Sequence, residues 1–167
     1  MVTEIYSNKL QRRNTLKPKL IKILASGLGL GYVPFAPGTA GSLLGIPLVM
    51  VMAPFPWMIY LLSTISFACL AIYLADGAEK LFQVKDASPI VIDEVAGMLV
   101  TFFLVTPTPA HIAVGFLLFR FFDVVKIFPA NWCQSHLPGG LGVVADDLAA
   151  GLYANLVLLG LIYKFGF

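Results

Sequence analysis

The sequence predicts an all-α fold: an integral membrane helical bundle of about five membrane helices, preceded by an N-terminal amphipathic helix at the membrane interface. Of the 167 residues, 59% are hydrophobic and 12% are charged, which leaves little solvated surface. The segment Trp57–Ala75 carries no charge and approaches the roughly 20 residues that cross a bilayer. The length fits a single domain, residues 1–167, in which each ionisable group indicates topology or function.

The N-terminal arm, residues 1–26, is basic and contains a predicted interfacial helix. Its basic residues are Lys9, Arg12, Arg13, Lys17, Lys19 and Lys22. Apolar residues recur there at helical spacing, and Thr15 and Pro18 suit a helix start. We predict a helix over residues 15–26 that lies on the membrane with its lysines towards acidic head groups, the alternative being an ordinary cytoplasmic arm.

A segment rich in glycine and proline, residues 27–42, separates this helix from the first apolar stretch. Two prolines and a glycine within residues 34–38 end any preceding helix, and Thr39 or Ser42 can cap a new one. The alternating glycines are weak evidence for a dinucleotide site, because no strand precedes them. We expect a flexible loop next to the membrane.

Four apolar stretches then supply the membrane helices. They are Leu43–Ala53, Trp57–Ala75, Val95–Phe119 and Leu148–Tyr163. The third is too long for one span and is broken at residues 106–109 by a Thr-Pro-Thr-Pro turn, which predicts a hairpin between two helices. Several stretches are shorter than a span, so they must include flanking residues, thin the bilayer or lie buried in the bundle.

The charges predict how these helices are threaded. The positive-inside bias places the basic N-terminus in the cytoplasm. The connections around residues 76–94 and 120–147 then return to the same side, and of all Lys and Arg residues only Lys164 lies outside. Only the N-terminus is placed by its charge, so the agreement of the later charges supports this topology.

The same threading brings five carboxylates to one depth near the cytoplasmic surface. They are Asp93, Glu94, Asp123, Asp146 and Asp147. Asp93 and Asp147 are each followed four residues later by a glycine, Gly97 and Gly151, which permits close approach of a neighbouring helix. We therefore expect two helices that begin at acid pairs to pack together and bring their acids into contact.

Two explanations of these acids remain open. An acid at a helix N-terminus acts as a cap and interacts with the helix dipole, for about 1 kcal/mol. Two adjacent acids at each of two helix starts exceed what capping needs, and crowded carboxylates are stabilised by a divalent cation. Oxygen ligands without a His or Cys cluster favour Mg²⁺ over Zn²⁺.

Cations and a glycine-rich helix start can hold an anionic group beside these acids. Arg120 and Lys126 share one helix face with Asp123 and can bind phosphate oxygens, although Arg120 can instead pair with the acid. Gly38, Thr39 and Ser42 belong to a segment with accessible backbone N–H groups and two hydroxyls, which suits phosphate but is not a Walker loop.

A glycine-rich stretch, Gly139–Gly142, is expected to let the loop before the last acid pair bend over the site. No Cys-x5-Arg loop is present, because Gly139 stands six residues after Cys133, and no Asp-x-Asp motif occurs. A metal-activated water with a carboxylate as proton acceptor is therefore the phosphatase chemistry that remains.

Four sequence blocks together resemble the phosphatidylglycerophosphatase A family. They are Phe35–Ser42, Ile92–Gly97, Phe119–Lys126, and Gly139–Gly142 followed by Asp146 and Asp147. The resemblance covers roughly residues 26–155 and implies a Mg²⁺-dependent phosphatase of the bacterial inner membrane. It would convert phosphatidylglycerophosphate to phosphatidylglycerol in phospholipid biosynthesis, at a cytoplasmic site. The chain departs from the family at Ile127, where proline is usual, and at Pro138, where a basic or polar residue is common.

Each site residue thus has a predicted role. The predicted metal ligands are Glu94, Asp123 and Asp147; the predicted catalytic carboxylates are Asp93 and Asp146; the predicted phosphate-binding residues are Gly38, Thr39, Ser42, Arg120 and Lys126. The substrate partner is a phospholipid, and a net charge of +2 is too small to indicate nucleic acid.

Two rival functions remain. A small cation-coupled transporter or channel subunit would carry its acids near the bilayer midplane, whereas the threading places them at one interface. A phospholipid-forming phosphotransferase would carry a longer Asp-Gly…Ala-Arg…Gly…Asp signature, which the sequence lacks.

Overall fold

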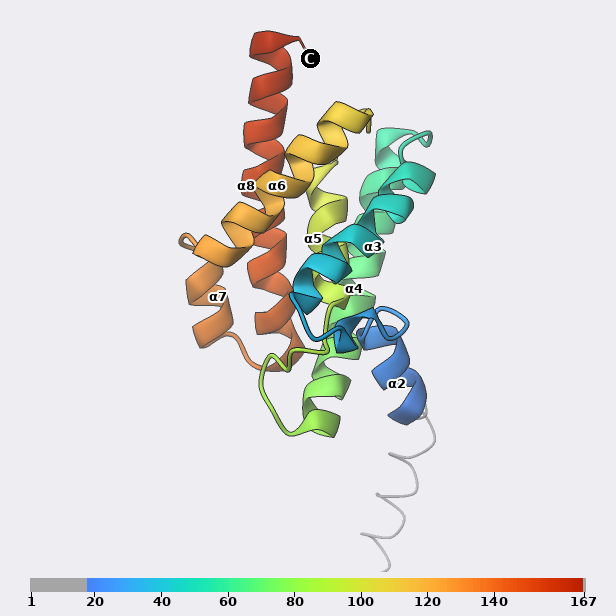
Figure 1. The fold of residues 1–167 in the computed structure, drawn as a ribbon, viewed down its shortest axis with the longest axis vertical. Helices are drawn as coiled ribbons and strands as arrows, with labels where there is room; N and C mark the ends of the chain where they lie inside the picture. The colour runs from blue at the N-terminus through green and yellow to red at the C-terminus, as the bar shows by residue number, and fades with distance from the viewer. Residues whose placement is uncertain (1–17, 167) are drawn as a thin grey trace, which may run out of the picture.

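The computed structural model describes residues 18–166, and in this part of the chain the only regular secondary structure is helical, without strands (Figure 1). In order, the elements are α2 (Pro18–Ala25), η1 (Leu30–Tyr32), α3 (Pro37–Met52), α4 (Trp57–Phe82), α5 (Ile92–Thr101), α6 (Pro109–Val125), α7 (Ala130–His136) and α8 (Gly139–Phe165). The all-α prediction is confirmed. Residues 15–17 of the predicted interfacial helix lie outside the described part, and the rest of that helix forms as α2.

Helix α5 is the centre of the bundle, packed most extensively against α8 and also against α3 and α4 (Figure 1). Two glycines make the contact with α8 possible. A Cβ on Gly97 would collide with the ring of Phe119 and lie 2.8 Å from the carbonyl oxygen of Asp147. A Cβ on Gly151 would collide with the carbonyl of Gly97. The predicted close approach at these glycines is confirmed.

Helix α5 is short and ends inside the bundle. Its ten residues extend about 15 Å, roughly half of the hydrocarbon thickness of a bilayer. Side chains from neighbouring helices donate hydrogen bonds to carbonyl groups at its end and in the turn that follows. The Asn155 amide donates to the carbonyls of Thr101, at 2.9 Å, and Phe103, at 2.7 Å, and the Tyr60 hydroxyl donates to Leu99, at 2.8 Å. Bonded carbonyls of this kind allow a helix to end in an apolar environment.

The predicted hairpin within the third apolar stretch is confirmed. After α5 the chain turns through residues 102–108, and α6 begins at Pro109, where the Thr108 side chain accepts a hydrogen bond from the N–H of His111 at 3.1 Å. Two of the described helices, α4 and α8, are long and apolar enough to cross a membrane by themselves. The helical membrane bundle is consistent with these two helices, and the count of about five membrane helices stays a prediction.

The start of the last helix differs from the prediction. Helix α8 begins at Gly139, so Asp146 and Asp147 lie in its third turn and do not open it, and residues 127–145 contain α7 instead of one long loop. Gly139 provides a bend where α8 begins, with a left-handed φ of 54°, and the two glycines that follow it in the helix serve packing. A Cβ on Gly140 would collide with the carbonyl of Ile72, and one on Gly142 would lie 2.6 Å from the carbonyl of Leu137.

Helix α3 also begins earlier than predicted. Pro37 is its first residue, and the preceding Ala36 adopts a left-handed conformation with φ of 47°. Thr39 and Ser42 therefore lie within the helix and do not cap it. The Ser42 hydroxyl donates to the carbonyl of Gly38 at 2.8 Å, as hydroxyls inside helices often do.

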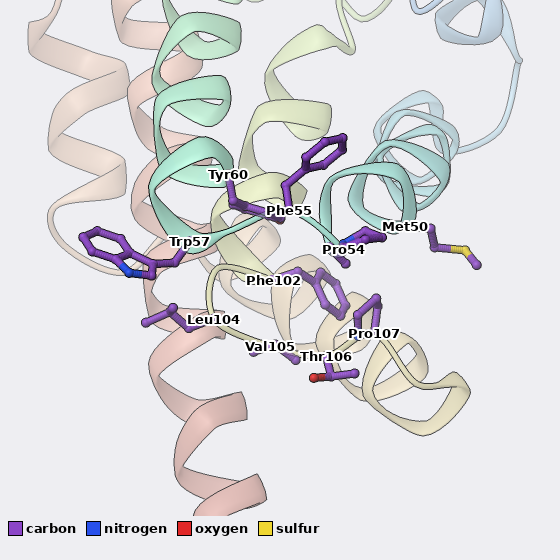
Figure 2. Close-up of a pocket in the computed structure, with 11 residues that line it drawn as sticks. Met50, Pro54, Phe55, Trp57, Tyr60, Phe102, Leu104, Val105, Thr106 and Pro107 are labelled. Carbon is purple, nitrogen blue, oxygen red and sulfur yellow. The ribbon is translucent and has the colours of Figure 1, made fainter.

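The opposite ends of α3 and α5 border two different cavities. One, of about 460 Å³, lies between the α3–α4 turn and the α5–α6 turn and is lined by apolar side chains such as Trp57, Phe102 and Pro107 (Figure 2). The other lies where α3 and α5 begin, and it contains the predicted site.

Candidate active site

A cavity of about 310 Å³ gathers the predicted acids from three separate helices. Helix α5 contributes Asp93 and Glu94, α6 contributes Asp123, and α8 contributes Asp146 and Asp147. The predicted meeting of these carboxylates is confirmed. Three predicted phosphate-binding residues also line this cavity: Gly38, Arg120 and Lys126.

Three of the carboxylates form a compact group. Asp93, Glu94 and Asp147 each offer an oxygen, and these atoms lie within 4.8 Å of one another. The side chains of Asp93 and Asp147 belong to residues that are only 5% and 3% exposed. One oxygen of each of the three acids is buried without a hydrogen-bond partner among the described residues. Such a group is unfavourable by itself, because the charges repel each other and have lost their hydration.

Helix capping does not account for this group. Asp93 and Glu94 do lie in the first turn of α5, where acids interact with the helix dipole. Asp147, however, lies in the third turn of α8, beyond the first turn in which the dipole effect is felt. Of the two explanations left open by the sequence, the structure thus weakens the one based on capping, since a helix start cannot explain why Asp147 is buried against two other acids.

Two cations lie beside the three-acid group, each paired with another carboxylate. The Lys126 ammonium is 2.6 Å from Oδ2 of Asp146, and the Arg120 guanidinium is 2.5 Å from Oδ2 of Asp123. Lys126 follows the end of α6. Burial disfavours its charged form, but the hydrogen bond and charge of Asp146 outweigh burial and raise the pKa of Lys126. The cavity therefore presents positive charge next to the acids.

Asp146 is engaged at both oxygens. While Oδ2 contacts Lys126, Oδ1 accepts a hydrogen bond from the backbone N–H of Asp147 at 3.0 Å. Asp146 thus differs from the three-acid group, each member of which has an oxygen without a partner among the described residues.

The start of α3 reaches the acids because it carries glycine. A Cβ on Gly38 would collide with Oε1 of Glu94 and lie 3.0 Å from the Arg120 guanidinium. Ser42 is fully buried beneath this turn, and its hydroxyl lies 3.4 Å from Nη1 of Arg120. Thr39 and Ser42 are not among the residues that line the cavity, and their binding of phosphate stays a prediction.

Two polar residues that line the cavity were not predicted from the sequence. Asp86 and Ser88 lie in the connection between α4 and α5, and both line the cavity. In the sequence they belong to a short polar interruption between apolar stretches, which indicates a surface loop and nothing more specific. Only the fold shows that this connection turns back over the acids.

Comparisons with known proteins show which family the sequence is similar to. The family model for phosphatidylglycerophosphatase A matches residues 23–162. The chain is 37% identical over 145 residues to phosphatidylglycerophosphatase A of Escherichia coli K12, covering 86% of this chain and 82% of that protein. It is 34% identical over 159 residues to phosphatidylglycerophosphatase A of Haemophilus influenzae, covering 94% of this chain and 96% of the relative. No solved structure matches the chain.

Proposed function

The chain belongs to the phosphatidylglycerophosphatase A family, and we propose that it hydrolyses the terminal phosphate monoester of phosphatidylglycerophosphate, which yields phosphatidylglycerol and inorganic phosphate. The observation that carries this proposal is the cavity in which Asp93, Glu94 and Asp147 have unpartnered buried oxygens beside two cationic side chains. Acids that crowd together at this cost are explained by a ligand that neutralises them.

The three-acid group fits a divalent cation. Hard carboxylate oxygens suit Mg²⁺, and among the described residues no His or Cys lines the cavity. Glu94 and Asp147 would hold the ion, with Asp93 and Asp123 beside them. When bound, Mg²⁺ supplies charge stabilisation for the phosphoryl group and favours attack by water.

The side chains of the chain itself bind and orient the substrate. Arg120 and Lys126 contact phosphate oxygens with charged N–H donors, which make the stronger hydrogen bonds. Their partners Asp123 and Asp146 hold them towards the cavity. Gly38 keeps the start of α3 close to the site without a side chain that would fill the phosphate position.

Proton acceptance is assigned to Asp93. The sequence leaves Asp93 and Asp146 as candidates, and both oxygens of Asp146 are engaged, by Lys126 and by a backbone N–H. Oδ1 of Asp93 has no partner among the described residues and can accept a proton from the attacking water. Asp146 then acts as a positioning residue for Lys126.

We place the protein in the bacterial inner membrane with this cavity on the cytoplasmic side. Two apolar helices of sufficient length and many exposed large apolar side chains, such as Leu62 on α4, support a membrane location. A cavity at one end of the bundle suits a phosphate monoester at head-group level while the acyl chains lie along the helices. The same position argues against transport, which requires acids along a path through the midplane.

Phosphate release tests this proposal. Purified protein in mixed micelles of detergent and phosphatidylglycerophosphate should release inorganic phosphate with Mg²⁺ and form phosphatidylglycerol, and a chelator should stop the release. Folded protein that releases no phosphate under these conditions would contradict the proposal and favour a transport function.

A further inference from the structure

The connection between α4 and α5, residues 83–91, contains Asp86, which lines the cavity but does not belong to the three-acid group. Figure 1 shows this connection reaching from the lower end of α4 towards α7. Gln134 of α7 donates from Nε2 to Oδ2 of Asp86 at 2.6 Å. Lys85 donates to the backbone carbonyl of Gln134, also at 2.6 Å. Two contacts thus tie the connection to α7 beside the cavity.

The backbone at Asp86 is also constrained. Its N–H donates to Oε1 of Glu79 at 2.7 Å, and its φ of 50° is left-handed, a conformation uncommon outside glycine. Exposed loop side chains usually move freely, whereas Asp86 is held from its backbone and its side chain. These contacts keep the carboxylate of Asp86 at the cavity. Its Oδ1 receives no hydrogen bond from a described residue.

A carboxylate at this position selects for a particular partner. Ionised Asp accepts hydrogen bonds and donates none, and it repels the phosphate that the cavity is built to hold. Neither nearby lysine makes an ion pair with it: the Lys85 ammonium is bound to the Gln134 carbonyl, and the Lys126 ammonium is bound to Asp146. A hydrogen-bond donor close to the phosphate suits this position. In phosphatidylglycerophosphate that donor is the free hydroxyl of the glycerol that links the two phosphates.

We propose that Asp86, held in place by Gln134, determines head-group specificity by accepting a hydrogen bond from this free hydroxyl. The inference rests on the proposed function. It assigns a contact to the glycerol hydroxyl, a part of the substrate to which the three-acid group and the two cations are not proposed to bind. The cavity volume of about 310 Å³ is at the lower end of the range for small-ligand sites, which suits a compact head group.

The test removes the hydroxyl from the substrate and the carboxylate from the protein, separately and together. The full chain and the variant Asp86→Ala are assayed with Mg²⁺ on phosphatidylglycerophosphate and on an analogue whose glycerol hydroxyl is replaced by hydrogen. For the unmodified chain, kcat/KM should be about tenfold to a hundredfold higher with the hydroxyl, the range for a hydrogen bond with one charged partner. Asp86→Ala should remove this preference, mainly through a higher KM for the natural substrate.

Further variants separate specificity from a general structural role. Asp86→Asn keeps the size of the side chain and a neutral acceptor, so its preference should be intermediate. Gln134→Ala should weaken the preference in the same direction, because it frees the carboxylate. Ser135→Ala is the matched control on α7, since that hydroxyl bonds within its own helix, and it should retain the full preference.

The outcomes distinguish this inference from the proposed function. An equal fall on both substrates in Asp86→Ala would show that Asp86 acts on the phosphate or the cation, and an unchanged preference would show that it does not contact the hydroxyl. Either result overturns the inference while leaving the phosphatase activity established. Failure of the unmodified chain to release phosphate from either substrate would overturn the proposed function and this inference with it.

Discussion

The two ends of α5 treat buried polar groups in opposite ways. At its C-terminal end, the amide of Asn155 and the hydroxyl of Tyr60 bond the carbonyls that the helix leaves free, next to the apolar cavity of Figure 2. At its N-terminal end, Asp93 and Glu94 have buried oxygens without partners among the described residues, next to the second cavity. The same short helix thus has one end completed by the protein and another that requires a ligand.

This difference indicates that the C-terminal end of α5 contributes to stability and its N-terminal end to function. Bonded carbonyls cost little in an apolar interior, whereas unpartnered and crowded carboxylates destabilise the fold. Proteins retain such a cost mainly at functional sites. Changes at the acidic end should therefore remove activity with little loss of stability, and changes at the apolar end should do the reverse.

Removal of the cation should have the largest effect. We expect a chelator to abolish phosphate release and to lower the thermal midpoint, because a ligand at a hundred times its dissociation constant stabilises the folded state by about 2.7 kcal/mol. Thermal unfolding with and without Mg²⁺ measures this shift, and Ca²⁺ is a useful comparison ion. A midpoint that does not respond to Mg²⁺ would be evidence against the cation site.

Asp147→Asn should lower phosphate release by at least about a hundredfold, a loss typical of a damaged metal site. The substitution keeps the shape of the side chain and removes one of three crowded charges. In the presence of chelator its thermal midpoint should therefore equal or exceed that of the unmodified chain, while the response to Mg²⁺ is lost. Retained activity would remove Asp147 from the site.

Gly97→Ala tests whether the helix contact sets the geometry of the acids. The added Cβ would meet the Phe119 ring and the carbonyl of Asp147, so α5 and α8 must separate. We expect a loss of about 1–3 kcal/mol in stability together with reduced activity. Gly160→Ala is the control, since a Cβ there meets nothing within 4 Å. Normal activity in Gly97→Ala would show that the spacing of the acids does not depend on this contact.

Asn155→Ala should affect stability and spare catalysis. It leaves the carbonyls of Thr101 and Phe103 without their donor, at a cost of about 1–3 kcal/mol. Phosphate release per folded molecule should change less than about twofold, because the donor lies at the far end of α5. Thermal unfolding and specific activity measured on one preparation would show whether the two ends are independent.

Met50→Ala should have the smallest effect. Met50 lines the apolar cavity and the residue is 54% exposed, so truncation should change stability within about 0.5 kcal/mol and leave activity unaltered. A clear loss of activity would mean that the apolar cavity takes part in the reaction, which would end the distinction between the two ends.

Local patterns in the sequence were sufficient to locate the long apolar helices and most of the acids that line the cavity, but not α7 or the first residues of α3 and α8. Long apolar stretches require internally bonded backbone in a membrane, the Thr-Pro-Thr-Pro segment requires a turn, and the scarcity of charge points to each carboxylate. Gly97 and Gly151 also predicted the contact between α5 and α8, because glycine permits close helix approach wherever the partner lies.

The tertiary structure alone decided which polar groups share a cavity. In a sequence, a glycine can indicate either a bend or a close contact between helices. The structure shows that Gly140 packs against α4 within α8, which therefore begins well before Asp146. Asp86 stands in an ordinary polar connection, and only its bonds to Gln134 and Glu79 hold it at the site. Helix formation depends on neighbours along the chain, whereas the meeting of charges depends on segments far apart in sequence. For this reason the sequence predicted most of the helices and only the tertiary structure showed which charges share a cavity.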